Sequence, residues 1–256
     1  MVRLHWLMRV ILLGTGTSAG VPAIACSCRV CTSTDPRDKR LRTAAAVQWV
    51  DDDGTDRTVL IDAGPDLRQQ ALRHGLTRCD AVLFTHNHVD HTFGVDELRR
   101  FNAVQHAPID IYGEDRTLEH LRQVYRHIFE AHKNVNDSFV ATLIAHRIEP
   151  ETPIDLHGLR FTPIRLLHGR LPVLGFRIDE ASPGGAAAQR DLERGTRHAT
   201  PSILPLAYCT DVSAIPPESW RTLRGLRTLV LDALRPRKHP THFSIEEAVN
   251  AAANIG

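Results

Sequence analysis

The heptapeptide Thr85-His86-Asn87-His88-Val89-Asp90-His91 carries three imidazoles and one carboxylate within six residues. The apolar run at 82–84 precedes it and predicts the end of a buried strand. Imidazole and carboxylate groups are ligands that zinc, manganese and iron accept in proteins. We therefore predict that a metal-binding loop leaves the end of this strand.

The composition of the chain is that of an ordinary globular protein. Its 31 basic and 30 acidic residues give a formal charge of +1, which offers no argument for a nucleic-acid partner. No apolar run approaches the roughly 20 residues that a membrane-spanning helix needs. The five cysteines are odd in number and do not form a disulfide framework, so we expect a reduced, cytoplasmic protein.

Apolar periodicity and turn residues predict alternating strands and helices within one domain over 1–256. Predicted strands cover 10–13, 44–50, 58–61, 81–84, 109–112, 145–148, 159–166, 174–178, 207–209 and 228–231. Predicted helices cover 66–75, 95–101, 116–132 and 244–253. Residues 181–206 are rich in Gly, Pro, Ala and Arg, which indicates a flexible insertion. The pattern favours a layered α/β or α+β sandwich.

The glycine-rich loop at 14–20 follows the first predicted strand and has two interpretations. Its glycines partly match a dinucleotide-binding fingerprint, but that fingerprint requires a helix directly after the loop. Val21, Pro22 and a cysteine cluster follow instead. We therefore favour a tight turn, in which glycine permits a close approach of two backbone segments.

Further metal ligands are expected at other strand ends, because the loop at 86–91 does not complete a two-metal site. His168 follows the apolar run at 166–167, and Asp211 follows the predicted strand at 207–209. Alone, His168 would be interpreted as a surface histidine and Asp211 as a turn or cap residue. Beside the cluster at 86–91, we interpret both as ligands.

The sequence His86-Asn87-His88-Val89-Asp90-His91 matches H-x-H-x-D-H, and on this motif the chain resembles the metallo-β-lactamase superfamily. The resemblance implies an α+β fold, the four-layered αββα sandwich. It implies that His86, His88 and His168 bind one metal ion, that Asp90 and His91 bind a second, and that Asp211 bridges both. Asp62, in Leu60-Ile61-Asp62-Ala63-Gly64, resembles the residue that orients this loop.

A finer resemblance is to the PhnP-type phosphodiesterases, with tRNase Z a more distant relative. It rests on the glycine-rich opening and on Cys26-Ser27-Cys28-Arg29-Val30-Cys31. Cys26, Cys28 and Cys31 predict most of a structural zinc site, although three thiols without metal are the alternative. His242, before Ser244 and the last predicted helix, resembles the histidine proposed to protonate the leaving oxygen. Its alternative interpretation is a neighbour of a helix capped by Ser244.

One departure from the resemblance concerns the end of the sequence. The superfamily carries a Thr-His-x-x-His segment after its last helix, and the PhnP-type branch uses its second histidine in the thiolate site. The sequence ends at Gly256 without this segment. We therefore expect one missing ligand at each site, which indicates either a truncated form or a weakly bound second metal.

The function expected from these residues is hydrolysis of a small or cyclic phosphodiester by two divalent ions, zinc or manganese. A metal-bridging hydroxide is the expected nucleophile, His242 the general acid, and Asp90 a further catalytic residue. A tRNase Z-like RNA phosphodiesterase is an alternative, favoured only by Arg190, Arg194, Arg197 and His198 in the insertion. A non-hydrolytic accessory protein of a biosynthetic pathway is another. A homodimer is implied by resemblance only.

Overall fold

A computed structural model describes residues 8–136, 139–181 and 202–256 of the chain. These residues form two compact units. The N-terminal unit comprises Met1–Trp49 and Asp56–Ile148, and the C-terminal unit comprises Val50–Thr55 and Glu149–Gly256. Each unit has its own sheet, and each is described by itself. The prediction of one domain over 1–256 stays a prediction, and most of the predicted insertion, 182–201, lies outside the described residues.

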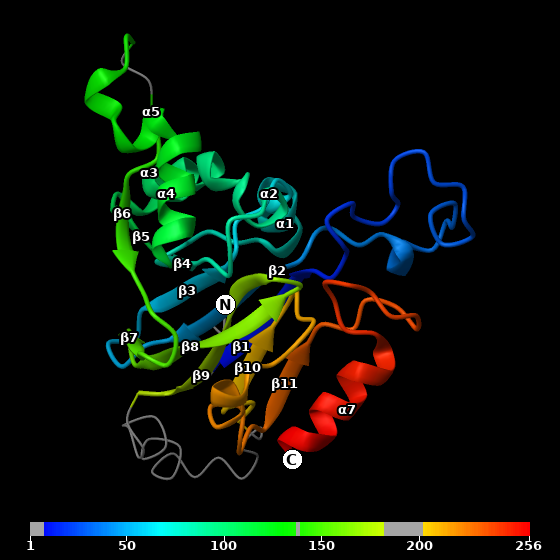
Figure 1. Ribbon diagram of the computed structural model, residues 1–256. Coiled ribbons are helices and arrows are strands. Elements are labelled where there is room, and N and C mark those ends of the chain that lie inside the picture. The colour runs from blue at the N-terminus through cyan, green and yellow to red at the C-terminus, as the bar shows by residue number, and fades with distance from the viewer. Residues whose placement is uncertain (1–7, 137–138, 182–201) are drawn as a thin grey trace, which may run out of the picture. The chain divides into compact units, whose positions relative to one another are not determined.

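The N-terminal unit is built on a mixed six-stranded sheet (Figure 1). Its strands pair in the order β1 (Met8–Gly14), β2 (Ala44–Val50), β3 (Asp56–Ile61), β4 (Ala81–Leu83), β5 (Ile109–Gly113) and β6 (Leu143–Arg147). β1 and β2 are antiparallel, whereas β3 to β6 are parallel. The carboxyl ends of parallel strands meet at one edge of a sheet, which is where ligand-binding loops gather.

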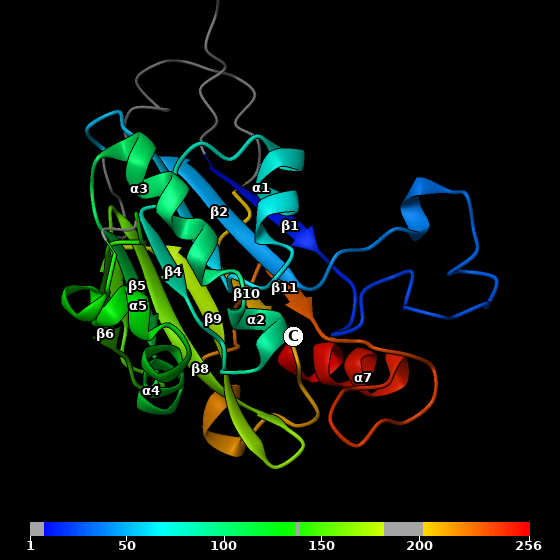
Figure 2. The same cartoon turned by 90° about the horizontal axis from the view of Figure 1, so that it is seen from above.

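Helices cover one face of this sheet, and α1 and α3 lie over it in Figure 2. They are α1 (Leu67–His74), α2 (Val89–Thr92), α3 (Arg99–Gln105), α4 (Asp115–Val124) and α5 (Arg126–Phe129), with 3-10 turns at Pro36–Asp38, Val95–Leu98 and Ala131–Lys133. Leu67, Leu98 and Leu121 from the helical side share a buried cluster with Leu60 and Ile111 of the strands. This packing holds the loops between strands and helices in place.

The predicted helix over 116–132 is wrong as one continuous element. The chain leaves helical geometry at Tyr125, where φ is −106° and ψ is 43°. The Tyr125 side chain is buried, and its hydroxyl donates to the carbonyl oxygen of Thr92, 3.1 Å away. A tertiary contact therefore accompanies the break, although the apolar spacing continues through it.

The C-terminal unit has a five-stranded mixed sheet in the order β11-β10-β9-β8-β7. Its strands are β7 (Ile154–Leu156), β8 (Leu159–His168), β9 (Leu171–Glu180), β10 (Leu206–Cys209) and β11 (Thr228–Leu231), and a 3-10 turn covers Pro217–Trp220. β8 and β9 form a long antiparallel hairpin, and β10 runs parallel to β11. β7, which is three residues long, was not predicted from the sequence.

The last helix, α7 (Ile245–Ile255), packs on this sheet through its small residues. Ala248, Ala251 and Ile255 share a buried cluster with Ile164 of β8 and Ala207 of β10. Ser244 caps the helix: its hydroxyl accepts from the Glu247 N–H, and the Glu247 carboxylate accepts from the Ser244 N–H. This capping box fixes the first residue of α7, and His242 lies just before it.

The glycine-rich loop makes the close backbone approach that the sequence predicted. A Cβ at Gly14 would lie 2.0 Å from the Arg42 carbonyl oxygen, and one at Gly16 would lie 2.7 Å from that of Arg40. Val21 then pairs with Arg40 in an isolated bridge, in place of the helix that a dinucleotide site requires. The α+β class is confirmed, since each unit combines a mixed sheet with helices. Among the described residues, no helix is both long enough and apolar enough to span a membrane.

Candidate metal centre

The segment 86–91 that the sequence singled out follows β4: His86 and His88 lie in the loop after that strand, and Asp90 and His91 lie in α2. The rings of His86 and His91 are buried, whereas His88 is exposed. The ring centroid of His86 lies 4.5 Å from that of His88 and 4.2 Å from that of His91. Asp90 places a carboxylate oxygen 3.4 Å from Nε2 of His91. The structure therefore brings the predicted imidazoles of this loop together.

Asp62, at the end of the neighbouring strand β3, holds this segment by hydrogen bonds. Its carboxylate accepts from the Thr85 N–H at 2.8 Å, from the Thr85 hydroxyl at 2.8 Å and from Nδ1–H of His91 at 2.7 Å. Burial raises the pKa of Asp62, while the contacts with His91 and Thr85 act in the opposite direction. Asp62 therefore fixes the orientation of the His91 ring, whose Nε2 faces Asp90.

Two glycines allow the loop to sit against the Asp62 strand end. A Cβ at Gly64 would lie 1.9 Å from the Asp90 carbonyl oxygen, and one at Gly94 would lie 2.0 Å from that of Gly64. Backbone hydrogen bonds from Ala63 N to His91 O (2.9 Å) and from Gly94 N to Ala63 O (2.8 Å) close the contact. Sequence analysis missed this clamp, although Gly64 stands two residues after Asp62.

A second group of ligand-type side chains lies within the C-terminal unit. His168 is the last residue of β8, Asp211 follows β10 with a φ of 53°, and His242 precedes α7. Their ligand atoms all lie within 4.8 Å of one another. The ring centroids of His168 and His242 are 4.6 Å apart. Three residues that the sequence predicted separately are thus neighbours in this unit.

Each histidine of this second group is oriented by an oxygen acceptor. Nδ1–H of His168 donates to the Thr241 carbonyl oxygen at 2.7 Å. Nδ1–H of His242 donates to an Asp232 carboxylate oxygen at 2.6 Å, and Asp211 lies 3.5 Å from the same nitrogen. Asp232 also accepts from the Val212 N–H at 2.9 Å. These acceptors fix the orientation of both rings, as partners of metal-binding histidines usually do.

Asp232 is a functional candidate that the sequence analysis did not identify. It follows β11 directly, as Asp211 follows β10, and these two strands are parallel. A carboxylate immediately after an apolar run was the available signal, since parallel neighbours end at the same edge of a sheet. Thr85 was likewise missed, although it begins the histidine-rich loop.

The donor atoms of the two groups fit divalent cations of the zinc and manganese type. Imidazole Nε2 atoms oriented through Nδ1 are the usual form of a metal-binding histidine. Carboxylates beside them supply the negative charge that a divalent ion requires. Each unit therefore presents a chemically suitable set of ligands at the carboxyl ends of its strands.

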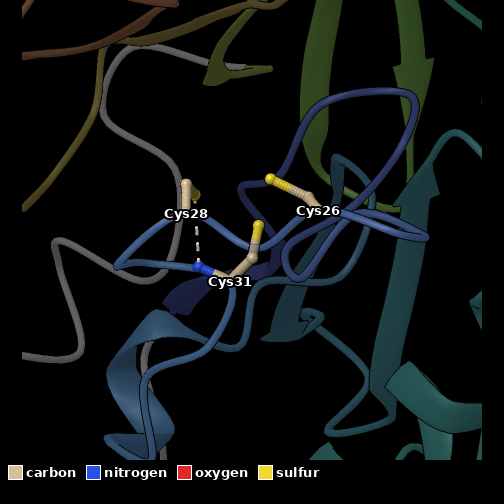
Figure 3. A group of neighbouring side chains, drawn as sticks. All are labelled: Cys26, Cys28 and Cys31. Carbon is tan, nitrogen blue, oxygen red and sulfur yellow. Dashed lines mark hydrogen bonds between the residues drawn. The ribbon is translucent and has the colours of Figure 1, made fainter.

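The predicted thiolate group lies on the long loop between β1 and β2 (Figure 3). The sulfur atoms of Cys26, Cys28 and Cys31 all lie within 4.8 Å of one another. The Cys31 N–H donates to the Cys28 sulfur at 3.5 Å, and this hydrogen bond, helped by Cys26, lowers the pKa of Cys28 to about 7. A gathering of three thiols, one of which has a lowered pKa, suits zinc, which binds thiolates.

Comparisons with known proteins place the chain in a family. Residues 57–256 match the family described as the beta-lactamase superfamily domain. A solved diphosphatase from the PhnP family is 35% identical with a TM-score of 0.77, over 97% of this chain and 82% of that one. Coenzyme PQQ synthesis protein B of Methylobacterium nodulans is 33% identical over 88% of this chain and 72% of its own length.

A longer relative is named octanoyltransferase, from Porphyromonas gingivalis, and is 36% identical over 250 residues. The match covers 97% of this chain but only 44% of that protein. The match over 57–256, together with the likeness to the PhnP-family diphosphatase, confirms the resemblance that the H-x-H-x-D-H loop indicated. The chain belongs to the metallo-β-lactamase superfamily and has its fold.

Proposed function

We propose that this chain is a metal-dependent phosphodiesterase that acts on a small or cyclic phosphodiester. The observation that carries the proposal is the orientation of His91, His168 and His242. In each, Nδ1 is held by an oxygen acceptor, so that Nε2 is directed to a ligand. The likeness to a PhnP-family diphosphatase supports cleavage of a bond to phosphorus.

The proposed ligands follow the superfamily's assignment. His86, His88 and His168 would hold one divalent ion, Asp90 and His91 the other, and Asp211 would contribute to both. Zinc and manganese both accept this set of nitrogen and oxygen donors. When bound, two such ions supply positive charge to the phosphoryl oxygens and lower the pKa of water. Asp62, through His91 and Thr85, keeps the N-terminal ligands in their orientation.

His242 is the proposed general acid. With Nδ1–H donating to Asp232, its other nitrogen would carry the proton that the departing alkoxide takes. General acid catalysis is typically worth about a hundred- to ten-thousandfold in rate, most for a poor leaving group. His242→Ala should therefore slow an alkyl phosphodiester strongly and a p-nitrophenyl phosphodiester little. Equal losses on both substrates would reject this role.

The test of the whole proposal measures metal content and turnover together. After growth with zinc or manganese, the purified chain should retain metal by plasma mass spectrometry and hydrolyse bis(p-nitrophenyl) phosphate. His88→Ala should lose metal and turnover, because His88 is a proposed ligand and its exposed side chain contributes little to packing. His132→Ala, at another exposed histidine, is the matched control. A metal-free wild-type chain would overturn the proposal.

We also propose that Cys26, Cys28 and Cys31 hold a structural zinc ion, separate from the catalytic ions. The proximity of their sulfur atoms supports this assignment. Cys28→Ser should lower the zinc content by about one ion per chain, while the affinity for the catalytic ions is retained. An unchanged zinc content would reject the thiolate site.

A second candidate function is that of a non-hydrolytic accessory protein in cofactor biosynthesis. The likeness to coenzyme PQQ synthesis protein B, at 33% identity over most of both chains, favours it. Metal retention without turnover of any phosphodiester would support this candidate over the hydrolase. An RNA phosphodiesterase of the tRNase Z type is less favoured, since a formal charge of +1 gives no argument for a nucleic-acid partner. Its basic candidates, Arg190, Arg194, Arg197 and His198, lie outside the described residues.

We also propose a compartment, a partner and an oligomeric state for the chain. We propose a cytoplasmic protein, because its cysteines suit a reducing compartment. A small-molecule phosphodiester is the proposed partner, with neither nucleic acid nor membrane. A homodimer is proposed by analogy with the PhnP-type branch and is tested by sedimentation.

A further inference from the structure

A closed loop over residues 234–243 connects β11 to α7 and carries His239 as well as His242 (Figure 1). The ends of this loop meet, because the Leu234 N–H donates to the Phe243 carbonyl oxygen at 3.0 Å. The ring centroid of His239 lies 5.1 Å from that of His242, the proposed general acid, with 46° between the ring planes. The loop therefore places a second imidazole beside the proposed acid.

The backbone before His239 is held by a side chain of the same loop. The Arg235 guanidinium donates to the carbonyl oxygen of Arg237 at 3.3 Å and to that of Lys238 at 2.9 Å. Both carbonyl groups lie within two residues of His239, so these hydrogen bonds limit the positions that its ring can take. A side chain that is already held in place costs little to order when a ligand binds.

Thr241 determines which nitrogen of His239 carries the proton. The Thr241 N–H donates to Nδ1 of His239 at 3.3 Å, and the Thr241 hydroxyl lies 3.1 Å from the same nitrogen. A neutral imidazole has one N–H, so a ring that accepts at Nδ1 carries its proton on Nε2. His168 and His242 have the opposite arrangement, since each donates through Nδ1–H. Neutral His239 therefore offers a hydrogen-bond donor at Nε2, which its two neighbours do not.

Thr241 also connects His239 to the candidate ligand His168. Its carbonyl oxygen accepts from Nδ1–H of His168 at 2.7 Å. Gly169, the residue after His168, has a φ of 63°, and a Cβ there would lie 2.9 Å from Cγ2 of Thr241. Thr241 thus packs against the end of β8 and orients a histidine on each side of itself. His239 and the candidate ligand share one positioning residue, which assigns His239 to the same site.

The Nε2 atom of His239 is suited to contact a substrate. The side chain is half-buried, and its printed partners within the described part of the chain all bind Nδ1. Partial burial, with His242 and Arg235 nearby, lowers the pKa of His239 below its ordinary 6.5, so the neutral ring predominates at pH 7. A fixed N–H donor beside a phosphoryl group stabilises the negative charge that builds on its oxygens.

We propose that His239 is a further catalytic residue, whose Nε2–H donates a hydrogen bond to a phosphoryl oxygen of the substrate. The proposal rests on the proposed function, since it requires the phosphodiester to lie beside His242. The two histidines then have different tasks. His242 gives its proton to the departing oxygen as the bond to phosphorus breaks, whereas His239 keeps its proton while charge develops on an oxygen that stays on phosphorus.

The test compares two esters with different leaving groups. Methyl p-nitrophenyl phosphate releases a stable phenolate, whereas ethylene phosphate releases an alkoxide. His239→Ala should lower kcat on both esters by about a hundred- to a thousandfold, because both reactions develop charge on the phosphoryl oxygens. His242→Ala should slow mainly ethylene phosphate. A loss on ethylene phosphate alone would show that His239 acts only through His242 and would overturn the proposal.

Two variants keep this comparison interpretable. His239→Gln should restore part of the rate, because its amide again places an N–H donor at the end of a side chain of similar reach. His132→Ala, at an exposed histidine of the N-terminal unit, is the matched control and should keep the wild-type rate on both esters. Equal rates in His239→Ala and His132→Ala would reject a catalytic role for His239.

Two further measurements do not depend on turnover. Proton–nitrogen NMR spectra of the histidine rings at pH 7 should show His239 with its proton on Nε2, and a proton on Nδ1 would overturn the proposal. Calorimetric titration of the metal-loaded chain with inorganic phosphate should show weaker binding for His239→Ala than for His132→Ala. Phosphate binding that depends on His239, with turnover of neither ester by the wild type, would keep the donor and overturn the phosphodiesterase.

Discussion

The two ligand groups of this chain are built in opposite ways. In the N-terminal unit the imidazoles and the carboxylate come from residues 86–91, one loop at the end of β4. In the C-terminal unit His168, Asp211 and His242 come from separate segments and meet only through the fold. Both groups nevertheless depend on distant partners for orientation: His91 contacts Asp62, 29 residues away, and His168 contacts Thr241, 73 residues away. In the N-terminal unit the candidate ligands are therefore neighbours in the sequence, whereas in the C-terminal unit they are not. In both units, residues distant in the sequence orient the histidines.

The largest effect should come from removing the partner on which the local group depends. Asp62→Ala should lower the free energy of unfolding by about 3–5 kcal/mol, because it leaves buried donors of Thr85 and His91 unsatisfied. Metal affinity should fall by about tenfold to a hundredfold. Urea denaturation and metal titration measure the two losses.

Asp53→Ala, in the exposed turn after β2, is the control and should change stability by at most about 0.5 kcal/mol. Asp62→Asn serves if the alanine variant does not fold, because it keeps the shape but offers a weaker acceptor. Full metal affinity in both Asp62 variants would contradict the dependence of the loop on its support.

A smaller effect should follow from adding a side chain at Gly64, one of the two glycines at which the backbone touches the 86–91 segment or its neighbours. Gly64→Ala places a Cβ 1.9 Å from the Asp90 carbonyl oxygen, so the loop must shift. We expect a loss of about 1–3 kcal/mol in unfolding free energy together with weaker metal binding. Gly113→Ala is the matched control, since its Cβ would meet neighbours at an ordinary 3.5 Å. Equal behaviour of the two variants would show that the clamp does not hold the loop.

In the C-terminal unit the corresponding partner is Asp232, and its loss should act on rate more than on stability. Asp232→Ala removes the acceptor for Nδ1–H of His242 and should slow an alkyl phosphodiester by about tenfold to a hundredfold. A p-nitrophenyl ester should be affected less, because it does not require a general acid. Glu246→Ala, exposed on α7, is the control. The same loss on both esters would assign Asp232 a merely structural role.

The smallest effect on function should come from Asp80, which stabilises the sheet of the N-terminal unit but does not contact the candidate ligands. Asp80, before β4, accepts from the Thr58 N–H at 2.8 Å and from the side chains of Arg57 and Arg78. Burial acts to raise the pKa of Asp80, but these donors outweigh it and hold that pKa below its ordinary 3.8. The carboxylate therefore contributes stability above pH 3.8, and the contribution is lost as the pH falls further.

Asp80→Asn should cost about 1–3 kcal/mol in unfolding free energy at pH 7, while metal content stays unchanged. The difference from the wild type should shrink when denaturation is measured below pH 3.8. Asp155→Asn, whose partner Arg160 is exposed, should cost about 1 kcal/mol or less. A difference for Asp80→Asn that persists at low pH would show that its charge is not the cause.

Prediction from the sequence succeeded where the signal is local. The loop at 86–91, the strand before it and the position of Asp62 at the end of β3 follow from an apolar run followed by polar residues. The same reasoning predicted both ends of the strand Thr228–Leu231 correctly. It did not identify Asp232, the next residue, as a partner of His242. A carboxylate after a strand is common in turns, and only the parallel pairing of β10 with β11 places it beside Asp211.

The prediction of one continuous helix over 116–132 was wrong for a related reason. Its apolar spacing is helical throughout, yet the chain turns at Tyr125, whose hydroxyl meets the end of α2. Propensity and periodicity describe a segment in isolation, and a contact with another segment overrides them. That contact also joins Tyr125 to the end of α2, which no spacing along the chain indicates.

The amino-acid sequence by itself determined the superfamily and predicted the chemical types of the candidate ligands, because both depend on consecutive residues and on positions at strand ends. The tertiary structure decided which oxygen orients His91, His168 and His242, and where a glycine lets two backbone segments touch. The physical reason is that orientation and exposure depend on neighbours brought together by strand pairing and core packing. Distance along the chain does not encode these contacts.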